Sequence, residues 1–511
     1  MALPNFTQYQ PPGVYWAQTS LPNTSTSPGL PNGVAIVGPS VGYRTYSQTL
    51  TLPIVANALT IPSSQPGVPQ YGIITSSIAI ANPAGGVYVG GNGLSTSGTD
   101  YVYAQTGSGT TATTQIALGT TGAITGAVTI TYNYVDTSFN TPTMVSDAAT
   151  AAAIYGPATT NIGTSANPNY QISSPITLAA SMAFDNGARN VWMVNVPWSD
   201  STNTSVTINA LNTAVNSLSA VDGVSIVVPL PVGLTVTTDI QSVAQNLSTY
   251  LTNQVSLNNV FQYGMFGWET GTTITNPTTV SSYSGVANPR LSVIYPGDVT
   301  WYNNGKTQTI GGYYLAASLA GVLARNPIQQ GLTKQVVNDI SGIDPVVFQN
   351  MTTTNKNTWS AGGVLVVELT RQGQMQVRHG VTSVSSTAST GTIYNREISL
   401  VRTQDDMIDT IYQTVTNSGL IGTPITGNTP SVIAGMVNIV LASLQLSGVI
   451  SSFGSITVAE ASVNPTVMNV TFVYVPAYPL NYITVTFGID TSTGSLTGAS
   501  TGSNSTGTIV G

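Results

Sequence analysis

One segment of the sequence has the spacing of a serine nucleophile. Gly38-Pro39-Ser40-Val41-Gly42 matches the G-x-S-x-G turn that exposes a nucleophilic serine between a strand and a helix in one class of hydrolases. The general base would have to be His379, the sole histidine, in the strand-like segment MQVRHGV. The residues after the turn, Tyr43 to Pro53, are rich in threonine and end in proline, so they do not predict the required helix. A structural turn is therefore favoured, and a serine hydrolase using Ser40 is the weaker interpretation.

Residues that bind metals or transfer protons are scarce elsewhere. His379 has no second histidine and no cysteine to complete a metal site, and phosphate-loop and H-E-x-x-H motifs are absent from the sequence. Asp405, Asp406 and Asp409 open a helix that we predict from Gln404 to about Val415. The helix dipole stabilises carboxylates in a first turn, although the same residues could form a face that contacts a partner. We predict no catalytic residue, no metal and no cofactor.

Charged residues are rare and unevenly placed. Only 6% of the 511 residues are charged, against roughly 25% in an average soluble domain. The formal net charge is -7, so the chain lacks the basic excess that neutralises phosphates, and we expect no nucleic-acid binding. Nine of the 11 Lys and Arg residues lie between Arg290 and Arg402, where charge-based contacts should map. A polar but nearly neutral surface suits lasting contacts between subunits, because burying a hydroxyl or amide costs less than burying an unpaired ion.

The first 150 residues predict an arm, a strand and a β-rich segment. Residues 1–32 are rich in proline and lack a long apolar pattern, so they should be extended. Val34 to Val37 is a short apolar strand closed by glycine and proline. From 57 to 150, short β-type runs alternate with Gly, Asn and Ser, which predicts a separate all-β domain.

The middle of the chain alternates between helix and strand. Helix-then-strand units are predicted at Pro175–Gly187 with Asn190–Val196, at Ile208–Leu218 with Val224–Leu230, and at Ile240–Leu251 with Val260–Trp268. Gly311 to Arg325 adds an apolar helix that Pro327 follows. Three successive units predict an α/β core around a largely buried sheet.

The stretch from Ser431 to Ile450 is long and uncharged enough to span a membrane. Ser431, Asn438 and Gln445, however, recur at seven-residue spacing on one helical face. This pattern favours an amphipathic helix of a soluble unit. The N-terminus also lacks the basic and apolar regions of a secretory signal.

Strands and a tail are predicted towards the C-terminus. Val467 to Val475 is a strong strand candidate, and residues 482–489 alternate apolar and polar side chains. The composition of 491–511 is typical of a flexible tail.

Four segments resemble one protein family. Pro12-Gly13-Val14-Tyr15 resembles the P-G-V-Y element that opens the contractile tail sheath proteins of tailed phages and related injection systems. Val34 to Gly38 resembles the family's first core strand and turn, and Gly311 to Pro327 resembles its apolar helix ending in Ala-Arg. The segment from Pro476 to Phe487, PAYPLNYITVTF, resembles the family's closing strand. Their order and spacing agree with the sheath plan along almost the whole chain.

The resemblance implies an α/β (α+β) fold with a mixed-sheet α/β core, an inserted all-β domain, and extended N- and C-terminal arms. On this plan residues 1–32 form the N-terminal arm, 33–56 and 151–475 the sheath core, and 57–150 an outward-facing β-domain. Residues 476–490 would form the C-terminal arm strand and 491–511 the tail.

The resemblance also implies a function. Sheath subunits stack as rings around a rigid tube, then rotate outward and shorten to drive the tube through the host envelope. The implied partners are further copies of the chain, the tail tube protein, and the baseplate and tail terminator proteins. The implied location is the virion tail, assembled in the host cytoplasm, with no membrane insertion by the sheath itself. Arms that add strands to a neighbour's sheet would hold the cores together while they slide.

The arms and the cationic segment supply the candidate contact residues. For contacts between subunits these are Pro12, Gly13, Val14 and Tyr15, together with Ile483, Val485, Phe487 and Ile489, which alternate along the last strand. For the tube contact they are Arg396, Arg402, Asp405, Asp406 and Asp409.

A non-contractile β-rich fibre or surface adhesin would share the composition rich in Thr, Gly and Asn. The three helix-strand units and the paired arms favour the sheath over this alternative.

Overall fold

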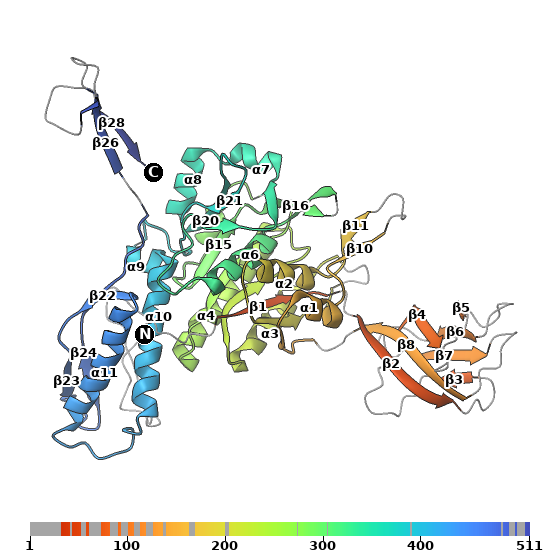
Figure 1. The fold of residues 1–511 in the computed structure, drawn as a ribbon, viewed down its shortest axis with the longest axis horizontal. Helices are drawn as coiled ribbons and strands as arrows, with labels where there is room; N and C mark the ends of the chain where they lie inside the picture. The colour runs from red at the N-terminus through yellow and green to blue at the C-terminus, as the bar shows by residue number, and fades with distance from the viewer. Residues whose placement is uncertain are drawn as a thin grey trace.

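The computed structural model describes residues 32–40 and 139–481, apart from 163–168, 200–203, 273, 304 and 389–390, together with the strands within 43–135 and 484–510. These elements form a mixed α/β arrangement with small β-sheets at both ends of the view (Figure 1).

A nine-stranded sheet forms the centre of the protein. The strand β1 (Gly33–Gly38) is buried along its whole length and runs parallel to its two neighbours, β12 (Val191–Asn195) and β13 (Val224–Pro229). Beyond β13 follow the parallel strands β14 (Tyr263–Phe266), β15 (Leu291–Tyr295) and β20 (Val364–Leu369), and then the antiparallel strands β21 (Met375–Val377) and β18 (Val336–Val337). At the other edge, β9 (Thr143–Val145) pairs antiparallel with β12. Parallel strands covered on both faces need continuous apolar runs, such as those of β1 and β13.

Two groups of helices cover this sheet. One group is α1 (Ala148–Tyr155), α2 (Pro175–Asp185) and α6 (Gly312–Arg325), and the other is α3 (Ile208–Asn216) and α4 (Thr237–Asn253). The three predicted helix-strand units and the predicted apolar helix that Pro327 follows are thus confirmed. All residues of α6 except Arg325 are buried, which explains its apolar sequence.

The contact between α2 and α6 depends on Gly321. A Cβ atom at this position would lie 2.2 Å from the carbonyl oxygen of Ala183. We expect Gly321→Ala to destabilise the core by about 1–3 kcal/mol, because packed helices would have to separate. Gly435→Ala is the matched control, since no atom lies within 4 Å of a Cβ there. Denaturant unfolding would measure both changes, and equal stability of the two variants would contradict this prediction.

The remaining elements of this part of the chain are short. They are β10 (Thr159–Asn161), β11 (Tyr170–Ile172), α5 (Thr278–Ser281), β16 (Asp298–Asn303), β17 (Lys306–Gly311), β19 (Ile340–Ile343), α7 (Pro345–Asn350), α8 (Thr353–Ala361) and α9 (Ile393–Arg396).

A second, smaller hydrophobic core lies between α10 (Ile398–Asn417) and α11 (Thr429–Leu446) and includes Val449 and Ile450. Two antiparallel strand pairs follow α11 in the chain. β22 (Ile450–Phe453) pairs with β25 (Tyr474–Pro476), and between them β23 (Thr457–Glu460) pairs with β24 (Met468–Thr471). The helix α11 is long and apolar enough to cross a membrane by composition alone. Ser431, Asn438 and Gln445 are exposed while Val437 and Leu441 are buried, so the predicted amphipathic pattern is confirmed.

Two predictions in this region are wrong. The helix predicted from Gln404 begins at Ile398, so Asp405 and Asp406 lie inside it rather than in its first turn. The single strand predicted from Val467 to Val475 is divided into β24 and β25, because its two ends pair with different partners.

The strands between 43 and 135 pair only with one another. One sheet contains β2 (Tyr43–Leu52), β8 (Gly126–Val135) and β4 (Ile73–Ala81), and the other contains β3 (Ala58–Thr60), β7 (Thr113–Leu118), β6 (Tyr101–Thr106) and β5 (Gly90–Asn92). Both lie to one side of the nine-stranded sheet (Figure 1). The boundaries expected for the β-domain, 57 and 150, do not coincide with this pairing. The strand β2 lies before 57 but pairs along its whole length with β8, and β9 lies before 150 but belongs to the central sheet.

At the C-terminal end, β26 (Thr484–Ile489) pairs with β27 (Leu496–Thr497) and β28 (Thr506–Val510). These strands lie apart from the two cores (Figure 1). Composition alone predicts a flexible tail over 491–511, whereas β27 and β28 fall within it and close a small sheet on β26.

Candidate assembly sites

The structure does not form the serine site that the sequence suggested. Ser40 is buried, and its Oγ donates to Oδ1 of Asn195 at 3.0 Å rather than to a histidine. His379 instead contacts Glu397 and Asn481. The chain continues into the strand β2, so the helix that a nucleophile turn requires is absent at this place. These contacts contradict the hydrolase hypothesis and assign Ser40 to a structural turn.

A buried ion pair fixes α10 to the central sheet. The Arg290 guanidinium donates from Nε to Oδ2 of Asp405 at 2.7 Å and also from Nη2 to Oδ1. Arg290 also lies over the ring of Phe261, 5.5 Å from its centre. Burial alone would lower the pKa of Arg290, but the Asp405 carboxylate outweighs burial and raises it. Burial raises the pKa of Asp405, and the charge and hydrogen bonds of Arg290 oppose that rise.

The hydroxyl of Tyr263 completes the shell around Asp405. Burial and the adjoining carboxylate raise the pKa of Tyr263 well above its usual range, so this hydroxyl is neutral and donates to Asp405. Arg402 and Asp406 are buried in the same part of α10.

Three residues predicted for the tube contact are therefore not at the surface. Arg402, Asp405 and Asp406 are 3%, 0% and 1% exposed, so their role as a contact face is corrected to one inside the fold. The sequence misled because the helix starts earlier than predicted, and all of its residues from Ile398 to Met407 are buried. The other two candidates are half-buried: Arg396 donates to the carbonyl of Ser360, and Asp409 accepts from Gln413.

Hydrogen bonds to the core hold the root of the C-terminal arm. The Tyr478 and Tyr394 hydroxyls are 2.6 Å apart, and Nδ2 of Asn481 donates to Oε1 of Glu397 at 2.9 Å. His379 contacts the same Glu397 oxygen. Sequence analysis missed this arm root. The partners in the Tyr478–Tyr394 and Asn481–Glu397 contacts are 84 residues apart in the chain.

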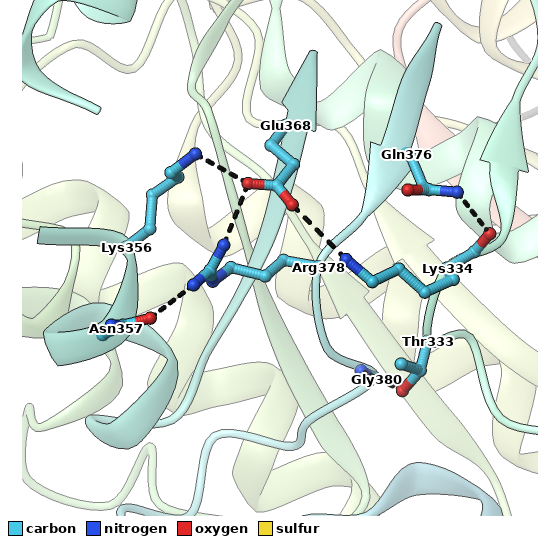
Figure 2. A network of polar contacts seen from close by, with 8 residues as sticks. All are labelled: Thr333, Lys334, Lys356, Asn357, Glu368, Gln376, Arg378 and Gly380. Carbon is cyan, nitrogen blue, oxygen red and sulfur yellow. Dashed lines mark hydrogen bonds and ion pairs between the residues drawn. The ribbon is translucent and has the colours of Figure 1, made fainter. Parts of the chain in front are cut away.

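Three cations surround one carboxylate near the β18 edge of the central sheet (Figure 2). This Glu368 cluster consists of Glu368 in β20, Lys356 in α8, Arg378 after β21, and Lys334 before β18. Lys356 Nζ lies 2.7 Å and Arg378 Nη1 3.1 Å from Oε2 of Glu368, while Lys334 Nζ lies 3.7 Å from Oε1. Burial of Glu368 opposes its ionisation, but the hydrogen bond from Lys356 and the three positive charges outweigh burial and lower the pKa of Glu368.

The cluster lies within the cationic segment that the sequence singled out. Spacing gave no sign of it, because four separate elements bring the side chains together. Among the described residues no group of His, Cys, Asp or Glu side chains could hold a metal ion.

The candidate arm contacts lie towards the two ends of the chain. Pro12, Gly13, Val14, Tyr15 and the whole N-terminal arm lie outside the described residues, as does Ile483. The strand β26 contains Val485, Phe487 and Ile489.

No known family model matches the sequence. A curated tail sheath protein of Mycobacterium phage Bxz1 is 25% identical over 98% of this chain and 99% of its own length. The fold is similar to the helical sheath of the anti-feeding prophage in its contracted state, with a TM-score of 0.52, 11% identity, and coverage of 93% of this chain and 98% of that one. A chain of the baseplate of the same prophage has a TM-score of 0.51 and 10% identity over 93% of this chain and 98% of that one.

A central α/β core, a second core beside it, and an arm anchored at its root define a structural subunit of a larger assembly. Over nearly its whole length the chain is similar to a phage tail sheath protein, and its fold is similar to that of a contracted helical sheath.

Proposed function

We propose that this chain polymerises as a helical cylinder around a tail tube and contracts to drive the tube through the host envelope. The observation that carries the proposal is the match to a tail sheath protein over nearly the full length of both chains. The likeness to a contracted helical sheath supports it at the level of the fold. The partners would be further copies of the chain, the tube protein, the baseplate and the tail terminator. The sheath would be part of the virion tail after assembly in the host cytoplasm.

Imaging of the purified protein by negative-stain electron microscopy tests this function. A sheath subunit should give hollow cylinders with a helical lattice, spontaneously or on added tail tubes. Isolated rods would favour the fibre or adhesin class, and compact particles at every protein concentration would contradict the proposal.

The C-terminal arm would link neighbouring subunits by strand addition. In the structure β26 pairs with β28 of the same chain, so an edge of the arm is already covered. We infer that, in the assembly, β26 pairs with the sheet of a neighbour, with Ile483, Val485, Phe487 and Ile489 on one face. Exchange of an intramolecular pairing for the same kind of pairing between molecules costs little, as in domain swapping. Pro12, Gly13, Val14 and Tyr15 would act similarly in the N-terminal arm.

The strands between 43 and 135 would form an insertion that points away from the tube. Both ends of this segment meet at Asn195: Ser40 N donates to its side chain at 3.1 Å, and Asn140 N donates to its carbonyl at 3.0 Å. Insertions are tolerated where the two ends lie close together at a complete host core. We therefore propose limits near 41 and 138 in place of 57 and 150, and the strand pairing supports this choice.

We predict that replacing 41–138 with a short Gly/Ser linker preserves folding and cylinder formation, because the insertion supplies no strand of the central sheet. Circular dichroism and negative-stain imaging would check both properties. A linker at 57–150 is the matched control, since it removes β9 and unpairs β2, and it should yield less folded protein. Loss of cylinders from a folded 41–138 variant would show that the insertion is part of the lattice.

For the tube contact we propose Arg396 and Asp409, two of the five residues named from the sequence. We keep both as candidates, because they are partly accessible and lie on or beside α10.

A further inference from the structure

We propose that the Glu368 cluster receives carboxylates of a second copy of this chain, so that the positive end of one core stacks on the acidic end of the next. The inference rests on the proposed polymerisation and names one of its contact surfaces.

The cluster has more positive charge than its own carboxylate can balance. Lys334, Lys356 and Arg378 supply three cations to the single Glu368. Arg371 adds a further exposed cation in the turn after β20. Cations held this close repel one another, and a second carboxylate would relieve that repulsion.

The cluster is also prepared for an incoming anion. The side chains of Lys356 and Arg378 are only 18% and 25% exposed, and Arg378 is held additionally by Asn357 (Figure 2). Lys334 is 53% exposed and makes the longest of the three contacts with Glu368. Its ammonium group can therefore turn towards a second carboxylate with little loss.

The complementary charge is found on the other half of the core. Residues 139–289 contain six acidic side chains and one basic side chain, whereas residues 290–402 contain nine basic and five acidic ones. Asp147, Asp185 and Asp222 are exposed in the acidic half. Asp147 follows β9, at the opposite edge of the nine-stranded sheet from the cluster, and Asp222 precedes β13. Asp185 lies instead near β18, since the side-chain amide of Asn338 donates to its carbonyl.

Opposite charges at opposite edges suit head-to-tail contacts. A contact between two different surfaces of identical subunits generates rings or open helices, which are the arrangements that a sheath needs. Charge pairs also fix the orientation of subunits, because like charges oppose the reversed stacking.

Charge exchange tests the proposal. The first variant, Lys334→Glu/Arg371→Glu, reverses the accessible cations, and the second, Asp147→Lys/Asp222→Lys, reverses the acidic edge. Each should raise the critical concentration for cylinder formation about tenfold, because reversal of two exposed charges replaces attraction with repulsion. The quadruple variant should recover most of the loss. Lys306→Glu, at an exposed site in the β16–β17 hairpin, should leave assembly unchanged.

Sedimentation and negative-stain imaging at low and high salt would give the critical concentrations, and thermal unfolding would confirm that every variant is folded. Full assembly by either double variant, or no recovery in the quadruple variant, would overturn the proposed contact. An equal effect of Lys306→Glu would do the same, because it would show a nonspecific charge effect. If the unaltered protein forms no cylinders at any salt concentration, the proposed function itself fails.

Discussion

Replacing Arg290 with methionine is expected to lower the free energy of unfolding by about 3–5 kcal/mol, because it leaves the Asp405 carboxylate buried without a counter-ion. Asp405 is fully buried, and the Tyr263 hydroxyl alone cannot offset the lost positive charge. Denaturant unfolding followed by tryptophan fluorescence would measure the change.

The double variant Arg290→Met/Asp405→Leu is the matched test of the cause. Removing both charges should recover much of the stability, since replacement of a whole buried ion pair by apolar groups is often neutral. Lys334→Met serves as a surface control and should change stability by about 0–1 kcal/mol. If the double variant is no more stable than Arg290→Met, the loss of stability comes from the shape of the arginine side chain rather than from its charge.

Deleting residues 482–511 is expected to abolish cylinder formation and leave a folded protein. The deletion removes β26 but keeps the arm root, including the Tyr478–Tyr394 and Asn481–Glu397 hydrogen bonds and the pairing of β25 with β22. The described residues of both cores all precede residue 482, so the thermal unfolding transition should change little.

Deleting only 491–511 is the matched control. This shorter deletion removes β27 and β28 but retains β26, whose edge would then be free for a neighbour. We expect cylinders from this variant, as judged by negative-stain imaging. Cylinders from the 482–511 deletion would show that β26 does not link subunits, and their absence from both deletions would assign the link to β28.

Local patterns in the sequence determined the layered core. The helix-strand alternation from Pro175 to Phe266 and the apolar helix α6 follow from side-chain periodicity, which each segment carries by itself. The same holds for α11, where polar residues at seven-residue spacing mark the exposed face.

Contacts between distant segments were decided only by the tertiary structure. Asp405 is read from sequence as a surface carboxylate, yet its partner Arg290 is 115 residues away and allows it to be buried. The segment Val467–Val475 has the pattern of one strand, but separate pairing with β22 and β23 divides it. The Glu368 cluster likewise needs four elements to meet. Periodicity reports which face of an element is apolar, whereas the partner that covers or neutralises that face depends on how the chain returns to it.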